Sequence, residues 1–407
     1  MIVVVGGSLG GLRAAEQLRA QGYRGPITVI GDETHPPYNR PPLSKEFLES
    51  PVTDEARSAL AFRQRASTAD VQWRLGVRAV RSDLAQKTVR LATGEEISYD
   101  GLVVATGLRP RRLDIDAPAE GRFVLRTIED SLALHERLRA GARVVIVGAG
   151  FIGCEVAATA VKVGCSVTVV EGATGPMERS LGRDLSRSMR SFMERRGVRF
   201  SPGRRVLGLL TGPDGACAGV TLDDGTELAA DVIVESIGSV SNVEWLGGNN
   251  LDLSDGVLCD GRMRVQGAAD VVAVGDIARY PDLVLGGPAR RVEHWATPGD
   301  TARIAAATLL ADLAGQPAPE ARSPLPSFWT DLCGVRLLGV GSPGIATTVG
   351  ALEGDLASPE HGVALGYFRD DLLVAAITVG LPANRQLHYR TLVSTARDLA
   401  TSSPTAL

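Results

Sequence analysis

Two segments of this 407-residue chain share one local design, and that repetition limits the possible folds more than any other feature. Residues 3–33 read VVVGGSLGGLRAAEQLRAQGYRGPITVIGDE, and residues 143–171 read RVVIVGAGFIGCEVAATAVKVGCSVTVVE. Each segment contains an apolar run, a glycine-rich turn, an alanine-rich helix and a second apolar run that ends in an acid. Such units form parallel sheets whose turns bind dinucleotides, so two dinucleotide sites are expected.

The second glycine turn matches the pattern GxGxxG with Gly148, Gly150 and Gly153. The first glycine permits the tight turn, the second lets the backbone approach a pyrophosphate, and the third lets helix and strand pack closely. Glu171 follows Gly150 by about 20 residues, where an acid accepts hydrogen bonds from ribose hydroxyls. A carboxylate there repels a 2′-phosphate, so NADH is expected rather than NADPH. The alternative is a surface acid at a strand end.

The first turn, residues 6–11 (GGSLGG), is less regular, because Ser8 stands where the second glycine of the pattern is expected. Serine is small enough for the backbone still to reach a pyrophosphate. Asp32 and Glu33 both fill the acidic place at the strand end. One acid would suffice, and the sequence does not decide between them, although Asp32 is favoured.

Length, charge and cysteine spacing exclude several classes of protein. The chain is longer than one core usually organises, so two or three domains are expected. A net charge of −4 argues against general nucleic-acid binding. No stretch reaches the roughly 20 apolar residues of a membrane helix, and the opening apolar run is too short for a secretory signal. The cysteines show no CxxC or CxxxxC spacing, so we expect no metal site and a soluble, cytoplasmic protein.

Residues 37–45, PYNRPPLSK, are the most distinctive peptide in the chain. They resemble the PYxRPPLSK signature of FAD-dependent ferredoxin reductases, the putidaredoxin-reductase-like group to which rubredoxin reductase and apoptosis-inducing factor are related. The resemblance extends in order over essentially the whole chain, and Ser8 and the arginine-rich composition are similar to actinobacterial members. The other matching peptides are VVATGLRPRRL (103–113), VLRTIEDSLAL (124–134), GAGFIGCEVAA (148–158), VVAVGDIA (271–278), RVEHWATP (291–298) and PLPSFWTDL (324–332).

The resemblance implies an α/β fold with two Rossmann-like dinucleotide-binding domains, like that of glutathione reductase, and a small α+β C-terminal domain. The FAD-binding domain is expected to be discontinuous and to comprise residues 1–112 and 240–320. The NADH-binding domain is expected over residues 113–239, and the C-terminal domain over residues 321–407.

Lys45 and Glu155 are the residues to which the resemblance assigns the reaction. Lys45 would lie near the reactive N5 edge of the flavin, and Glu155 would pair with it across the gap between flavin and nicotinamide. Buried charges need a partner, and the chain has only three lysines, at 45, 87 and 162, so this pairing is physically sensible. The alternative is a surface lysine and an acid on a helix face.

The same resemblance assigns further residues to the cofactors. Asp276 would bind the FAD ribityl chain, although it could equally cap a helix. His294 would position the flavin, because hydride transfer needs no proton shuttle, and Trp329, with Phe328, would lie against the flavin unless it is an ordinary core tryptophan. Arg179 would approach the NADH phosphates or ribose. The expected cofactor-binding residues are Gly6, Ser8, Leu9, Gly10, Gly11, Asp32, Glu33, Arg40, Lys45, Ala79, Ala105, Thr106, Gly107, Arg126, Gly148, Gly150, Phe151, Ile152, Gly153, Glu155, Glu171, Arg179, Gly238, Gly275, Asp276, Glu293, His294, Trp295 and Trp329.

These expectations describe an NADH-dependent flavoprotein that reduces a ferredoxin of the 2Fe-2S, or 3Fe-4S/4Fe-4S, type. A flavin that accepts hydride and releases single electrons suits such a carrier, which would supply a cytochrome P-450-type or Rieske oxygenase. The ferredoxin is expected to be a separate protein. Arg290 and Arg291 are candidate contacts for it, unless they are ordinary solvated charges, and a monomer is expected.

Several alternatives share the fold. Rubredoxin could be the acceptor, or the protein could be a redox-sensing flavoprotein resembling apoptosis-inducing factor. A disulfide reductase, an NADH oxidase or a peroxidase would need redox-active cysteines where PYNRPPLSK stands, so these are disfavoured. Glu235 and Ser236 stand where relatives tend to have smaller or apolar residues. The sequence does not decide how this difference affects the nicotinamide side of the site.

Overall fold

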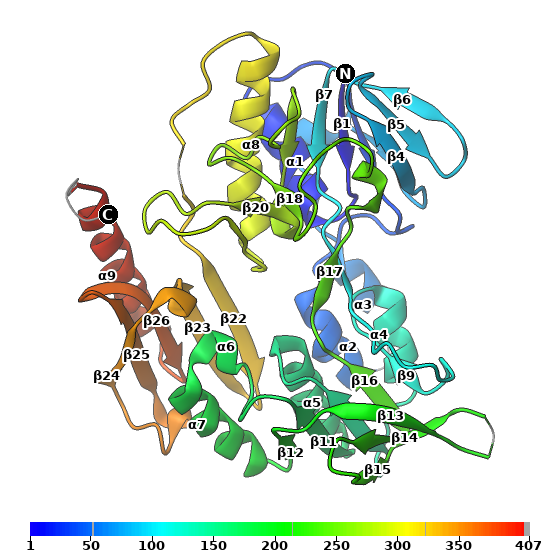
Figure 1. Ribbon diagram of the computed structural model, residues 1–407, viewed down its shortest axis with the longest axis vertical. Coiled ribbons are helices and arrows are strands. Elements are labelled where there is room, and N and C mark those ends of the chain that lie inside the picture. Colours follow the sequence, from blue (N-terminus) through cyan, green and yellow to red (C-terminus); the bar gives the residue numbers. More distant parts are fainter. Residues whose placement is uncertain (51–52, 214, 322, 403–407) are drawn as a thin grey trace.

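The structure is a computed structural model that describes residues 1–50, 53–213, 215–321 and 323–402 (Figure 1). Over these residues the chain forms two parallel sheets and one large antiparallel sheet, with smaller sheets attached. No helix in the described part of the chain has the length and apolar character needed to cross a bilayer.

The first parallel sheet has five strands in the order β19-β7-β1-β2-β3. Strands β1, β2 and β7 are buried along their whole length, as the apolar runs of a parallel sheet require. α1 (Leu9–Ala20) and α8 (Thr297–Leu313) pack against each other beside this sheet (Figure 1). Its strands are β1 (Ile2–Val5), β2 (Ile27–Ile30), β3 (Gln72–Arg74), β7 (Gly101–Val104) and β19 (Val271–Ala273).

The second parallel sheet also has five strands, in the order β12-β11-β10-β16-β9. α5 (Phe151–Val163) follows the second glycine turn and ends at Gly164, whose φ of 94° is typical of a helix C-terminus. The strands are β9 (Arg122–Phe123), β10 (Arg143–Val147), β11 (Ser166–Glu171), β12 (Arg199–Pro202) and β16 (Val232–Glu235).

The third sheet is antiparallel, with the order β22-β23-β26-β25-β24. Its edge strand β22 contacts α5, so the third unit touches the second (Figure 1). α9 (Ala383–Ser402) packs on β26 and β23. The strands are β22 (Ser327–Leu332), β23 (Val335–Gly341), β24 (Thr348–Glu353), β25 (Val363–Arg369) and β26 (Leu372–Val379).

Two short antiparallel strands, β8 (Leu108–Pro110) and β17 (Ser239–Ser241), carry the chain between the first and second units. Beside them Thr106 Oγ1 donates to the Asn242 carbonyl at 2.8 Å, and Asn242 Nδ2 donates back to the Thr106 carbonyl at 2.9 Å. The remaining elements are α2 (Glu46–Glu49), α3 (Asp54–Leu60), α4 (Ile128–His135), α6 (Glu178–Leu181), α7 (Arg183–Glu194), β4 (Ala79–Asp83), β5 (Thr88–Leu91), β6 (Glu96–Ser98), β13 (Val206–Thr211), β14 (Cys217–Leu222), β15 (Glu227–Ala229), β18 (Val257–Leu258), β20 (Ala278–Tyr280) and β21 (Arg290–Arg291).

The predicted fold class is confirmed. Each glycine turn joins a buried parallel strand to a helix, and the two strands belong to different sheets. The predicted domain limits at residues 112, 239 and 320 stay a prediction.

Candidate functional site

A cavity of about 1360 Å³ lies where the carboxyl ends of the first sheet face α5 and β22. It is larger than the roughly 300–1,000 Å³ of ordinary small-molecule pockets, so it has room for a dinucleotide. The predicted residues that line it are Gly6, Ser8, Leu9, Gly10, Asp32, Glu33, Arg40, Lys45, Ala79, Ala105, Thr106, Gly107, Arg126, Phe151, Ile152, Glu155, Gly275, Asp276, Glu293, His294, Trp295 and Trp329.

The first glycine turn forms one wall of this cavity. Gly6 has φ +129°, and a Cβ on it would lie 2.0 Å from the Ala105 carbonyl oxygen. A Cβ on Gly11 would lie 1.9 Å from the Gly6 carbonyl oxygen. Ser8 stands at the N-cap of α1 but makes no side-chain cap bond, so the first N–H groups of α1 remain for a ligand phosphate.

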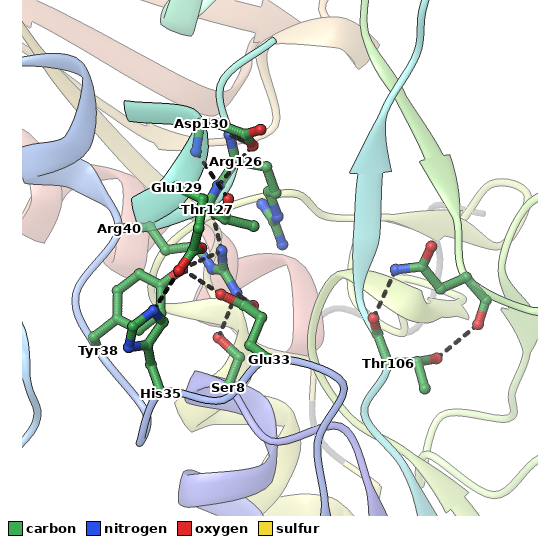
Figure 2. Close-up of polar contacts among 11 residues, drawn as sticks. Ser8, Glu33, His35, Tyr38, Arg40, Thr106, Arg126, Thr127, Glu129 and Asp130 are labelled. Atoms are coloured by element: carbon green, nitrogen blue, oxygen red, sulfur yellow. Dashed lines mark hydrogen bonds and ion pairs between the residues drawn. The ribbon is translucent and has the colours of Figure 1, made fainter. Parts of the chain in front are cut away.

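A polar network around Arg40 fixes the segment that follows β2 (Figure 2). Arg40 donates to Glu33 Oε1 at 2.5 Å, to Ser8 Oγ at 3.2 Å and to the Arg126 carbonyl. Tyr38 donates to the second oxygen of Glu33. Asp32 is exposed and pairs with Arg78 at 3.1 Å. Both acids line the cavity, so the choice between them for a ribose stays open.

Three buried polar atoms at the cavity have no protein partner: Oδ1 of Asp276, Nδ1 of His294 and Nε1 of Trp245. Burial raises the pKa of Asp276 to about 6, and Arg126 opposes that shift. Burial, with Arg290, lowers the pKa of His294 to about 4, so this ring is neutral at physiological pH. Buried polar groups without partners are costly, so these three atoms indicate a polar ligand.

Lys45 and Glu155 form an ion pair, with Nζ 2.6 Å from Oε1. Both side chains are largely buried, with exposed fractions of 12% and 9%. Lys45 Nζ also donates to the Pro41 carbonyl at 3.2 Å, and it lies 5.4 Å from the centre of a Trp329 ring. The structure therefore contains the pairing that the resemblance implied, while the catalytic roles stay predictions.

Aromatic rings form the apolar wall next to this pair. The Phe328 ring lies 5.2 Å from that of Phe151 and 5.2 Å from that of His294, measured between centres. Trp295 is 46% exposed and donates to Asn39 Oδ1 at 3.0 Å. This wall favours a planar, apolar ring system as the neighbouring part of the ligand.

The three glycines of the second turn, Gly148, Gly150 and Gly153, are outside the lining of this cavity, although Phe151 and Ile152 of the same turn line it. A Cβ on Gly148, at φ +98°, would lie 2.3 Å from the Ser236 carbonyl oxygen, and one on Gly153 would lie 2.2 Å from the Gly148 carbonyl oxygen. Gly150 stands at the N-cap of α5 and meets nothing within 4 Å, so its surroundings are open to a ligand. The turn can therefore accept a second phosphate group.

Glu171 lies at the end of β11 beside this turn. Its two oxygens accept from the backbone N–H groups of Ala149 at 2.6 Å and Ala173 at 2.9 Å. Arg179 is exposed on α6, and Gly238, at φ +101°, accepts from the Arg111 N–H at 2.9 Å. Glu171 thus holds the turn in shape as well as placing a negative charge at the predicted ribose position.

The family described as pyridine nucleotide-disulphide oxidoreductase matches residues 1–298. This chain belongs to that family. A rubredoxin-NAD(+) reductase of Pseudomonas putida is 32% identical over 94% of this chain and 96% of that protein. The ferredoxin–NAD(+) reductase component of the p-cumate 2,3-dioxygenase system of Pseudomonas putida is 33% identical over 98% and 91%. The crystal structure of the covalent putidaredoxin reductase–putidaredoxin complex superposes with a TM-score of 0.87 at 30% identity, over 97% and 93%.

Membership of the pyridine nucleotide-disulphide oxidoreductase family implies FAD and NADH as cofactors. The residues present fit FAD, because the large cavity combines a phosphate-binding turn, three unpartnered polar atoms and an aromatic wall. The second turn, with Glu171 beside it, fits NADH. The family's name refers to disulphides, but all five cysteines of this chain are free. The segment next to the cavity has the sequence PYNRPPLSK, which contains no cysteine.

Arg290 and Arg291, the candidate contacts for a ferredoxin, both interact with acids of this chain. Arg291 pairs with Asp255 at 2.7 Å and Glu293 at 2.8 Å, and Arg290 donates to Ser342 and lies 3.6 Å from Asp282. Arg291 is thus paired within the chain, whereas Arg290 shares Asp282 with Arg397, which lies 2.8 Å from the same carboxylate. A role for either arginine in docking stays a prediction.

The departure at Glu235 has a structural reason. Its buried carboxylate pairs with Arg122 at 2.6 Å and accepts from the Leu113 N–H at 2.8 Å. Arg122 in turn donates to the carbonyls of Leu113, Ile115 and Ala117. The pair thus holds residues 113–117, which lead into the second unit, against the end of β16.

Sequence reasoning missed Ser44 and Thr330. Both hydroxyls donate to the Glu155 carboxylate, at 2.5 and 2.6 Å. Ser44 lies within the quoted signature and Thr330 directly follows Trp329, but a single sequence gives no signal that either hydroxyl points at Glu155.

Proposed function

We propose that this protein is an NADH-dependent, FAD-containing ferredoxin reductase that supplies a cytochrome P-450-type or Rieske oxygenase. The observation that carries the proposal is the Lys45–Glu155 ion pair. Lys45 follows η1 (Pro41–Ser44) beside the FAD-sized cavity, and Glu155 lies one turn into the helix of the second glycine turn. The pair therefore stands where the two dinucleotide sites meet.

The residues divide the work of such a reaction. The two turns bind phosphates, and Glu171 selects an unphosphorylated ribose. The rings of Phe151, Phe328 and Trp329 exclude water from the reacting edge. Bound FAD would accept hydride from NADH and release electrons singly. Lys45 holds a positive charge at the cavity wall, and His294, whose ring is neutral, positions the flavin.

Family names support the acceptor half of the proposal. Relatives are named as ferredoxin–NAD(+) reductase components of dioxygenase systems, and others as rubredoxin-NAD(+) reductases. The ferredoxin, of the 2Fe-2S or 3Fe-4S/4Fe-4S type, is a separate protein in this proposal, and the reductase works as a cytoplasmic monomer. Rubredoxin is the second candidate acceptor. A disulfide substrate is disfavoured, because a Cys154 thiol whose pKa is raised by burial is a poor nucleophile.

An anaerobic double-mixing experiment tests the proposal. The FAD-loaded protein is reduced with one equivalent of NADH and then mixed with oxidised ferredoxin, rubredoxin or hydrogen peroxide. Fastest reoxidation of the flavin by ferredoxin supports the proposal. Fastest reoxidation by rubredoxin selects the second candidate, and fastest reoxidation by peroxide contradicts both.

A further inference from the structure

The Glu155 carboxylate is held by three groups from two other parts of the chain. Ser44 Oγ, from η1 beside the first sheet, donates to Oε2 at 2.5 Å. Thr330 Oγ1, from β22 in the third sheet, donates to Oε1 at 2.6 Å. Lys45 Nζ lies 2.6 Å from the same Oε1. The third sheet, which holds neither glycine turn, therefore contributes directly to the ion pair.

Burial makes these two hydroxyls hard to replace. Counted over whole residues, the exposed fractions are 0% for Thr330, 4% for Ser44 and 7% for Glu155. Water has little access to the carboxylate, so a lost donor leaves a buried charge short of one hydrogen bond. Thr159 reinforces the arrangement, because its hydroxyl donates to the Ser44 carbonyl at 2.8 Å.

The position of the Lys45 ammonium depends on this carboxylate. An ammonium has three donors, and here one meets the Pro41 carbonyl and one meets Glu155. Because Lys45 also lines the cavity, the remaining donor is available to whatever the cavity binds. A shift of the Glu155 carboxylate would therefore move the charge that faces the ligand.

We propose that Thr330, together with Ser44, is a positioning residue: its hydroxyl fixes the Glu155 carboxylate, which fixes the Lys45 ammonium at the cavity wall. The claim that Thr330 fixes Glu155, and that Glu155 fixes Lys45, rests on the observed contacts alone. The consequence for the reaction rests on the proposed function, since it requires a flavin beside Lys45. The C-terminal unit is thus part of the reaction centre.

The three lysines give a readout that needs no catalysis. Lys87 and Lys162 pair with Asp270 and Glu49 nearer the surface and serve as internal references. The FAD-loaded protein is treated with a limiting amine-acetylating reagent, and labelling of each lysine is quantified by mass spectrometry. Thr330→Val keeps the shape of the side chain and removes the donor. It should raise Lys45 labelling about fivefold, the effect of one hydrogen bond, with both references unchanged.

Two variants control for structural damage. Thr330→Ser restores the hydroxyl and should return Lys45 labelling to the wild-type level. Thr378→Val removes a buried hydroxyl from the same sheet, which donates only to the Leu338 carbonyl at 3.3 Å, and should leave Lys45 labelling unchanged. Equal Lys45 labelling in wild type and Thr330→Val overturns the proposal.

The flavin midpoint potential tests the consequence in the same proteins. Thr330→Val should shift it to more negative values, because a displaced ammonium stabilises less of the negative charge gained on reduction. Thr330→Ser and Thr378→Val should keep the wild-type potential. Raised Lys45 labelling with an unmoved potential overturns the consequence for the reaction and leaves only the positioning of the ammonium. A wild-type protein that binds no FAD contradicts the proposed function instead. That outcome can be told apart from unchanged Lys45 labelling and from an unmoved potential, which both concern the Thr330→Val variant.

Discussion

Asp276 and His294 face the same cavity but respond to burial in opposite ways. Burial raises the pKa of the Asp276 carboxyl to about 6 and lowers that of the His294 imidazole to about 4. Between pH 5 and pH 7 the carboxyl therefore titrates while the ring stays neutral. Both residues were predicted from the resemblance, but their missing partners could be seen only in the structure.

The titration of Asp276 predicts a pH-dependent affinity for FAD. Ionised Asp276 can accept a strong hydrogen bond from a ribityl hydroxyl, and protonation below about pH 6 removes the negative charge that makes this acceptor strong. Affinity should fall as pH falls, by about tenfold between pH 7 and pH 5. Fluorescence titration of the FAD-free protein measures it. Asp276→Asn should bind FAD more weakly, and its affinity should not change between pH 7 and pH 5. If its affinity falls with pH as much as that of the wild type, another group than Asp276 causes the pH dependence.

The buried Glu235–Arg122 pair predicts a stability effect confined to the second unit. Glu235→Ala leaves the Arg122 charge buried without its partner, so unfolding should become easier by about 3–5 kcal/mol. The double variant Arg122→Met, Glu235→Leu leaves no unpaired charge, so its free energy of unfolding should fall by less than that of Glu235→Ala. Urea unfolding followed by circular dichroism makes the comparison. An equal loss in the two variants would contradict the explanation.

At the scale of elements, the two glycine turns show what a sequence pattern can and cannot specify. The strand, the turn and the helix of each unit followed from apolar runs and glycine spacing. The pattern did not show that Gly6 and Gly148 pack against the carbonyls of Ala105 and Ser236, because those segments are distant in sequence.

Gly148 and Gly150 predict opposite outcomes from the same substitution. Gly148→Ala places a Cβ at φ +98° and 2.3 Å from a carbonyl oxygen, so stability should fall by about 3 kcal/mol. Gly150→Ala meets no neighbour and should cost less than about 1 kcal/mol. It should still raise the KM for NADH, because the Cβ stands where a pyrophosphate approaches. Thermal unfolding and NADH kinetics separate these effects, and an unchanged KM in Gly150→Ala would remove this turn from the NADH site.

At the scale of the whole molecule, the fold was predictable and the junction between its units was not. Two repeated dinucleotide units and a third segment follow from one sequence, since each has its own local pattern. The convergence of Ser44, Glu155 and Thr330 spans 286 positions of the chain and depends on how three sheets meet (330 − 44 = 286). Likewise, the engagement of Arg290 and Arg291 by acids of other segments could not be seen in a basic pair of residues.

NADH-driven reduction of cytochrome c, with and without an added ferredoxin from the same genome, tests the central claim most directly. The account predicts a slow rate with the purified yellow protein alone and a large rate that depends on ferredoxin concentration. It also predicts higher kcat/KM for NADH than for NADPH. Rapid bleaching of the flavin by NADH with no stimulation by ferredoxin would contradict the assignment as a ferredoxin reductase, while leaving the NADH and FAD sites in place.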